Sequence, residues 1–216
     1  MPSLAEKYRP ATLDDVVGQP KAVATLQRLD LTGRAVLFGA ASGSGKTCLA
    51  RAAAATVADP IATVEIDAAD IGLADVREYE RMLSYRPLAT KPCYAFIVNE
   101  VHRMSNAVVS RFLTLLEEPA ALRHGFFAFT TTSEGQKKLF GDAFDAIPFA
   151  SRCLKPRMAT AENNLIKDFA AHAKEVAEQE GLSSGHDVAL FESLVKRCQC
   201  NLREVYSQLE EGVFIG

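Results

Sequence analysis

The chain has 216 residues, of which 48% are hydrophobic and 24% are charged, and its formal net charge is −3. This composition is typical of a globular protein with a buried core, and it excludes a disordered or low-complexity chain. The acidic balance excludes a generally basic surface, so any contact with DNA requires a local patch or an assembly. The start, "MPSLAEKYRP", lacks an apolar signal-peptide core, and no run of 18 apolar residues occurs. We therefore expect an intracellular, soluble protein with no membrane contact.

The first two-thirds of the chain alternate short apolar runs with helical patterns. Strands are predicted at 35–40, 62–67, 93–98 and 125–132, and helices at 47–57, 75–83 and 108–117. Apolar strands that alternate with helices are typical of a parallel sheet covered on both faces. We predict an α/β fold for residues 1–155.

The pattern changes after Pro156. Helices are predicted at 160–180 and 187–198, and a third begins at Asn201, with Glu204 in capping-box spacing. Residues 156–216 are therefore predicted to form a small all-helical domain. The five cysteines are odd in number and have no C-x-x-C spacing, which favours buried or idle thiols over disulfides or a zinc site.

The segment "AASGSGKT" at 40–47 follows a predicted strand and opens a predicted helix, which is the context of a phosphate-binding loop. Glycine allows backbone N–H groups to point at phosphate oxygens, and the helix adds its positive end. Lys46 is expected to reach the β- and γ-phosphates, and Thr47 to bind Mg²⁺. The alternative is an ordinary Gly/Ser-rich turn before a helix. The predicted nucleotide-contacting residues here are Ala41, Ser42, Gly43, Ser44, Gly45, Lys46, Thr47 and Cys48.

The segment "CYAFIVNEVH" supplies the second half of such a site. Glu100, at the end of a strand, is expected to orient and polarise an attacking water. Asn99 stands where an aspartate normally accepts hydrogen bonds from magnesium-bound water. At the end of the next strand, Thr131 is our choice to contact the γ-phosphate or the water, with Thr130 and Thr132 as register alternatives. The alternatives are a solvated carboxylate and a threonine run without a ligand.

Five segments carry a family resemblance. They are "EKYRPATLDDVVGQ" (6–19), "DAADIGLADVREYE" (67–80), "NEVHRMS" with "FLTLLEEP" (99–105 and 112–119), "TTSEGQKKL" (131–139) and "SRC" (151–153). In this order they resemble the AAA+ module of DNA polymerase sliding-clamp loaders, both bacterial gamma/tau subunits and small subunits of replication factor C. The resemblance covers almost the whole chain, and it implies a P-loop NTPase fold followed by a helical lid.

The resemblance implies roles for individual residues. An adenine and ribose site would be formed by Tyr8, Arg9, Pro10, Val17 and Gly18. Arg152 would be an arginine finger that reaches a neighbouring subunit's nucleotide, and Arg203 would be the lid arginine. Arg77, helped by Arg103, would face the DNA backbone, although a solvated helix charge is an equal alternative for Arg77.

The resemblance also implies ATP and Mg²⁺ as cofactors. The implied partners are other loader subunits in a pentameric ring or spiral, a sliding clamp and primer–template DNA. The location would be cytoplasmic, or nucleoid-associated for a bacterial or phage protein. The leading hypothesis is an ATPase that helps to open and load the clamp, with hydrolysis slow in the isolated chain.

Three departures from the family pattern bear on these hypotheses. Asn99 replaces the usual aspartate, which favours a second hypothesis: an ATP-binding but weakly hydrolysing or non-hydrolysing structural subunit that donates Arg152. The zinc module of gamma/tau subunits is missing between the two nucleotide motifs. A helical collar is also missing before Gly216, so we expect either a shortened chain or a ring held by other contacts.

Another AAA+ DNA-remodelling ATPase is a third hypothesis for the function, and a small-molecule kinase ranks below it.

Overall fold

The computed structural model describes residues 2–132, 146–159, 163–183 and 185–212. Within them, parallel strands form one sheet in the order β1-β4-β3-β2. The strands are β1 (Arg34–Gly39), β2 (Thr63–Asp67), β3 (Tyr94–Asn99) and β4 (Gly125–Thr131). Each lies within one residue of its predicted bounds, so the predicted parallel α/β sheet is confirmed.

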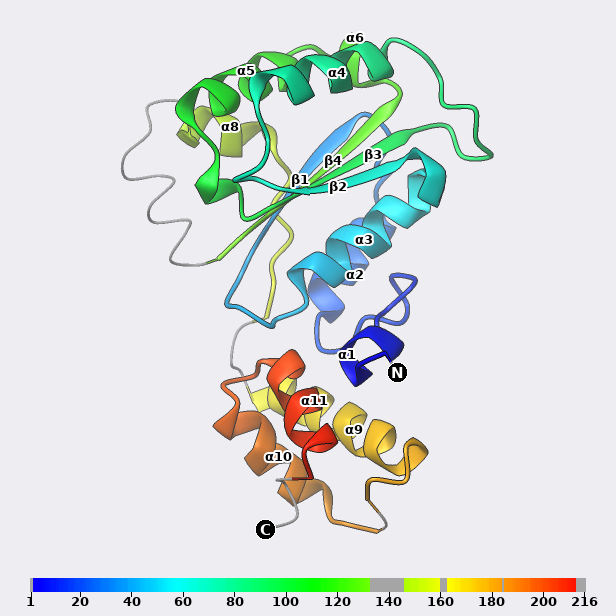
Figure 1. Cartoon of the computed structure of the whole chain (residues 1–216), viewed down its shortest axis with the longest axis vertical. Helices are drawn as coiled ribbons and strands as arrows, with labels where there is room; N and C mark the ends of the chain where they lie inside the picture. The colour runs from blue at the N-terminus through cyan, green and yellow to red at the C-terminus, as the bar shows by residue number, and fades with distance from the viewer. Residues whose placement is uncertain (1, 133–145, 160–162, 184, 213–216) are drawn as a thin grey trace.

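Helices cover both faces of the sheet (Figure 1). One face packs against α4 (Leu73–Leu83), α5 (Asn106–Leu116), α6 (Pro119–Leu122) and α8 (Ala146–Arg152). The other face packs against α2 (Pro20–Gln27) and α3 (Lys46–Val57). Consecutive strand residues point to opposite faces, so Phe127 and Phe129 lie in the first core and Phe126 in the second. The central strands β3 and β4 are apolar except at their carboxyl ends, and their apolar residues are buried on both faces of the sheet.

The predicted helices α3, α4 and α5 are present, together with several short elements that were not predicted. These are α1 (Leu4–Lys7), α2, α6, α8 and the 3₁₀ turns η1 (Pro60–Ala62) and η2 (Val101–Arg103). A helix of one or two turns is too short for an apolar repeat to stand out in the sequence.

The edge of β1 is partly covered by the segment that leads toward the C-terminal helices. Leu154 pairs with Val36 in a parallel bridge, with hydrogen bonds of 2.8 Å to the backbones of Ala35 and Leu37. This pairing fixes the position of the chain just before the predicted domain boundary at 155–156, which stays a prediction.

The C-terminal segment is helical, as expected, with α9 (Asn163–Gln179), α10 (Val188–Arg197) and α11 (Leu202–Glu210). These helices share a buried cluster to which Leu4 of α1 also belongs, and Figure 1 shows α1 beside them. Asn201 caps α11 by accepting from Glu204 N at 3.4 Å, but its own N–H donates to Cys198 O rather than completing a capping box.

The five cysteines are free, and all except Cys48 are buried. Of the helices in the described residues, none has the length and apolarity needed to cross a membrane.

Candidate nucleotide-binding site

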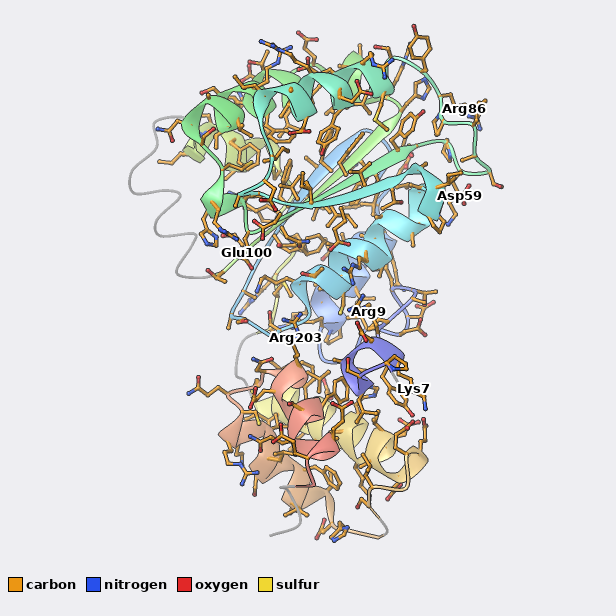
Figure 2. All side chains as sticks on the ribbon, viewed as in Figure 1. Lys7, Arg9, Asp59, Arg86, Glu100 and Arg203 are labelled. Atoms are coloured by element: carbon orange, nitrogen blue, oxygen red, sulfur yellow. The ribbon has the colours of Figure 1, made fainter. Side chains whose placement is uncertain are left out.

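A cavity of about 220 Å³ lies between the carboxyl end of the sheet and the C-terminal helices. The predicted site residues that line it are Tyr8, Arg9, Pro10, Val17, Ser42, Gly43, Gly45, Lys46, Thr47, Cys48, Glu100 and Arg203. Glu100, Arg9 and Arg203 all lie on the side of the sheet that faces these helices (Figure 2). Segments from both ends of the chain therefore meet at one cavity.

The loop between β1 and α3 has the backbone geometry of a phosphate cradle. Gly43 and Gly45 have φ values of 73° and 89°, a region that favours glycine, and Gly45 is the N-cap of α3. A Cβ on Gly43 would lie 1.9 Å from Asn201 Oδ1, so the loop packs directly against the start of α11. A Cβ on Gly45 would meet nothing within 4 Å, which leaves open space beside the helix N-terminus.

Lys46 is buried, with 6% of its surface exposed, and its Nζ donates to Ala41 O at 2.8 Å. Burial lowers the pKa of the Lys46 ammonium, while the carboxylate of Glu100 opposes that shift and Arg203 adds to it. Among the described residues, this ammonium has no anionic partner at hydrogen-bonding distance. An incoming phosphate would supply one.

The side chain of Asn99, at the end of β3, contacts side chains of α3, β4 and β2. Its Oδ1 accepts from Thr47 Oγ1 at 3.3 Å and from Thr130 Oγ1 at 3.0 Å. Its Nδ2 donates to Glu65 Oε1 at 2.8 Å. Asn99 lies behind Thr47 and is not itself part of the cavity lining.

Glu100 follows β3 in a left-handed conformation, with φ 55°, and its N–H donates to Thr130 Oγ1 at 3.2 Å. Non-glycine residues rarely adopt this conformation, which turns the side chain toward the cavity. Its Oε2 is buried and receives no hydrogen bond from the described residues; His102 Nδ1 lies 3.3 Å away, but outside hydrogen-bonding geometry. A buried carboxylate oxygen in this state is suited to accept from a bound water.

The hydroxyl of Thr131 lies 3.2 Å from His102 Nδ1, whereas Thr130 contacts both Asn99 and Glu100. Thr131 does not line the cavity. The role predicted for Thr131 stays a prediction, and the register alternative Thr130 is the one with direct contacts to the two strand-end residues. Thr132, the other alternative, follows β4.

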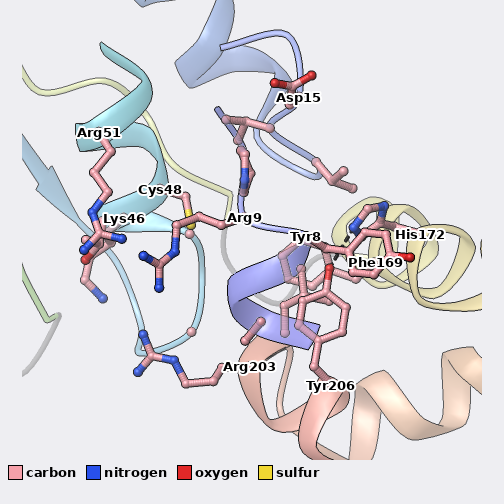
Figure 3. Close-up of a pocket in the computed structure, with 18 of the residues that line it drawn as sticks. Tyr8, Arg9, Asp15, Lys46, Cys48, Arg51, Phe169, His172, Arg203 and Tyr206 are labelled. Carbon is pink, nitrogen blue, oxygen red and sulfur yellow. Dashed lines mark hydrogen bonds between the residues drawn. The ribbon is translucent and has the colours of Figure 1, made fainter. Parts of the chain in front are cut away.

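The cavity has a cationic end and an aromatic end (Figure 3). Lys46, Arg9, Arg51 and Arg203 lie at the first, and Tyr8, Phe169, His172 and Tyr206 at the second. Fixed cations suit a triphosphate, and aromatic faces suit a nucleobase.

Sequence reasoning missed several lining residues. They are Ala5, Asp15, Val16, Arg51, Phe169, His172, Leu202 and Tyr206. Phe169 lies in the helix predicted at 160–180, and its side chain packs in the core of the helical segment. Only the docking of these helices brings residues near position 170 and position 206 to the phosphate loop.

Gly18 and its neighbour Gln19 connect the N-terminal segment to the helical one. Gly18 does not line the cavity; a Cβ on it would lie 2.5 Å from Leu165 Cδ1, so it packs against α9. The buried Gln19 side chain bonds to Ser44 O at 3.1 Å, to Ala159 O at 3.3 Å and to Ala159 N at 2.8 Å. Gln19 therefore ties the phosphate loop to the chain that leads into α9.

The remaining predicted residues lie outside the cavity lining. Ser44 Oγ donates to Ala41 O at 2.8 Å and shapes the loop. Arg152, at the end of α8, donates to Ser151 Oγ and to Glu117, each at 2.8 Å.

Neither of the predicted DNA-contacting arginines lines the cavity. Arg103 pairs with Asp67 at 3.0 Å, and Arg77 is exposed on α4. Of the five segments that carry the family resemblance, "TTSEGQKKL" falls mostly at 133–139, outside the described residues.

His172 predicts a pH dependence of stability. Its Nε2 lies 2.7 Å from the hydroxyl of Tyr206, and burial lowers its pKa despite the opposing charge of Glu175. Because the folded-state pKa is depressed, neutral His172 stabilises the fold above about pH 6.5, and this contribution is lost as the pH falls through the folded-state pKa. The unfolding temperature should therefore fall more between about pH 7.5 and about pH 5.5 in the wild type than in His172→Phe. Equal falls in the two proteins would contradict the prediction.

Comparison with known proteins agrees with this geometry. No protein-family model matches the chain. The chain is 28% identical to the DNA polymerase III subunit tau/gamma of Haemophilus influenzae, across 99% of this chain and 32% of that protein. It is 30% identical to the subunit gamma/tau of Mycobacterium tuberculosis, across 97% of this chain and 38% of that protein. The chain thus spans about a third of the length of these curated relatives.

Solved structures share the fold. A single-residue variant of RuvB from Thermotoga maritima aligns with a TM-score of 0.66 at 17% identity, over 94% of this chain and 64% of that one. A DNA polymerase III gamma subunit-related protein of the same organism aligns with a TM-score of 0.55 at 18% identity, over 87% of this chain and 58% of that one. The chain is a clamp-loader-like AAA+ module. At these identities the structural likeness shows the fold alone. The sequence relatives are what distinguish the clamp-loader type from other AAA+ proteins.

Proposed function

We propose that this AAA+ module binds ATP with Mg²⁺ and hydrolyses it as a subunit of a clamp loader. The cavity carries the proposal, because it joins a glycine-rich loop, a buried lysine and a strand-end glutamate to an end lined by aromatic side chains. AAA+ relatives are nucleotide-binding proteins in general, and one structural neighbour, DnaA of Aquifex aeolicus, was solved bound to AMPPCP.

The residues present fit a magnesium nucleotide. Thr47 and Asn99 offer a hydroxyl and an amide oxygen at one point, while Lys46, Arg9 and Arg203 supply positive charge. When bound, Mg²⁺ neutralises charge on the phosphates and orients them. Tyr8, Val17 and the aromatic end would hold the adenine and ribose.

In the proposed mechanism, Lys46 moves from Ala41 O to the phosphates. Glu100 orients a water through its buried carboxylate oxygen and receives the proton. Arg203, on the helical segment, binds the phosphates only while that segment is docked, so nucleotide binding would stabilise the docked arrangement. Arg152 would act on the nucleotide of the next subunit.

The proposed partners are other loader subunits in a ring or spiral, a sliding clamp and primer–template DNA. Arg77 is exposed and positioned on the outer helix layer. Arg103 would contact DNA only after leaving its ion pair with Asp67.

A Lys46→Ala variant tests nucleotide binding. Its affinity for a fluorescent ATP analogue with Mg²⁺ should be about 10- to 100-fold weaker than that of the wild type, because a charge-assisted hydrogen bond to phosphate is lost. Titration by fluorescence anisotropy measures this. Lys196→Ala, an exposed lysine on α10, is the control and should bind normally. Equal affinity in all three proteins, or none in the wild type, would reject the proposed site.

A second candidate function is an ATP-holding subunit that does not hydrolyse. Asn99 favours it, because an amide in place of a carboxylate removes a negative charge beside the magnesium site. Glu100 and Lys46 favour the hydrolysing subunit. ATP turnover of the assembled wild type, compared with that of Glu100→Gln, separates the two.

A further inference from the structure

Asn99 lies at the centre of a chain of hydrogen bonds that links β2, β4 and α3 near the carboxyl end of the sheet. On one side, Glu65 of β2 accepts from Asn99 Nδ2 at 2.8 Å. On the other side, Asn99 Oδ1 accepts from Thr47 at 3.3 Å and from Thr130 at 3.0 Å. Arg51 of α3 holds Glu65 in place with two bonds, of 2.6 Å and 2.8 Å.

The chemistry of these partners fixes which way the amide of Asn99 points. An ionised carboxylate only accepts hydrogen bonds, so the NH₂ group of Asn99 must face Glu65. The carbonyl oxygen then faces the two threonine hydroxyls, which can donate. The reverse orientation would set the amide oxygen against a carboxylate and would lose a charge-assisted bond.

We propose that Glu65 is a positioning residue that keeps the carbonyl oxygen of Asn99, rather than its NH₂ group, directed at Thr47 and the magnesium site. This inference rests on the proposed ATP and Mg²⁺ binding. An amide oxygen accepts hydrogen bonds from metal-bound water, whereas an NH₂ group would present a partial positive charge to the cation. Glu65 thus allows an asparagine at position 99, where an aspartate is usual, to present an oxygen to the magnesium site.

The same contact explains why asparagine, and not aspartate, suits position 99 in this chain. Aspartate would place a second carboxylate about 2.8 Å from Glu65, where like charges repel. Aspartate would, however, present an oxygen on either side and would need no orienting partner. Glu65 should therefore stabilise the fold when residue 99 is asparagine and destabilise it when residue 99 is aspartate.

A four-protein cycle tests this: wild type, Glu65→Leu, Asn99→Asp and the double variant. The first readout is thermal unfolding without nucleotide or metal. Removing Glu65 should lower the unfolding temperature when residue 99 is asparagine and raise it when residue 99 is aspartate. A purely structural role of Glu65 beside Arg51 predicts a fall in both backgrounds, and that result would overturn the proposal.

The second readout is the ratio of affinities for a fluorescent ATP analogue measured with Mg²⁺ and with chelator. Glu65→Leu should reduce this ratio about 3- to 10-fold when residue 99 is asparagine, the size expected for one reversed hydrogen bond. The ratio should not fall when residue 99 is aspartate. The milder Glu65→Gln change should shift both readouts in the same directions, which covers the case in which Glu65→Leu fails to fold.

The control is Glu78→Leu, which removes a glutamate that also holds an arginine, Arg81, through two bonds on the exposed face of α4. It should leave the magnesium ratio unchanged. If the wild type binds the analogue but Glu65→Leu does not alter the ratio, the inference fails and the proposed function stands. If the wild type binds no analogue, the proposed function fails and the inference fails with it.

Discussion

Arg152→Ala is expected to lower ATP turnover of the assembled protein by about 10³- to 10⁵-fold, the effect of removing an arginine that acts from a neighbouring subunit. The physical basis is its position. Arg152 ends α8, its side chain is 43% exposed, and it bonds to Ser151 and Glu117 rather than lining the cavity of its own chain. It is therefore available to a second copy, and its loss should leave nucleotide affinity of the isolated chain unchanged.

Mixing variants makes the test of Arg152 specific. Arg152→Ala and Glu100→Gln should each be inactive alone, yet an equimolar mixture should recover turnover at junctions where an intact Glu100 faces an intact Arg152. The measurement is steady-state phosphate release at high protein concentration with primed DNA. Arg123→Ala, at an exposed arginine that directly follows α6, is the control. A mixture as inactive as its components would argue against action between subunits.

Glu100→Gln is expected to lower turnover by about 10²- to 10⁴-fold while nucleotide affinity stays within a few-fold of the wild type. Glutamine keeps the shape of the side chain, but it cannot take a proton from water. The left-handed backbone at residue 100 and the buried carboxylate oxygen, which no described residue hydrogen-bonds, place this group for that role. Phosphate release and analogue binding, measured on the same preparation, separate catalysis from binding.

Two results would contradict the proposed role of Glu100 or the proposed hydrolysis. Turnover in the wild type that survives Glu100→Gln would remove Glu100 from the mechanism. No turnover in the assembled wild type, with binding intact, would favour the ATP-holding subunit that Asn99 suggests. Glu192→Gln on α10 serves as the matched control and should behave as the wild type.

Much of the fold followed from local pattern. The predicted strands β1, β3 and β4 are largely apolar, as strands that pack on both faces require, whereas β2 mixes polar and apolar residues and is only partly buried. All four lie within one residue of their predicted bounds. The loop between β1 and α3 was also predictable in position, because Gly43, Gly45, Lys46 and Thr47 are close in sequence and form one turn at the start of a helix. Short elements such as α1 and α8 left no periodic signal.

The aromatic end of the cavity could not be predicted from the sequence. Phe169 and Tyr206 are more than thirty positions apart in the sequence and more than a hundred from the loop between β1 and α3. In the sequence, neither differs from the other core-facing residues of a predicted helix. They belong to the site only because α9 and α11 dock beside α1, with Leu4 in their core and Gly43 against Asn201. Contacts of this kind depend on how helices pack, which the spacing of residues along one helix does not record.

The sequence by itself determined that this chain has a parallel α/β sheet and a glycine-containing loop between β1 and α3, because both depend on residues adjacent in the chain. Tertiary structure decided which threonine reaches Asn99, since the register of β4 places Thr130 there and Thr131 beside His102. It also decided that Glu65 faces Asn99, since these residues lie on neighbouring strands whose order no single segment encodes. Strand pairing and helix docking depend on contacts between residues that are distant in the sequence. These contacts determine which side chains surround Asn99 and line the cavity.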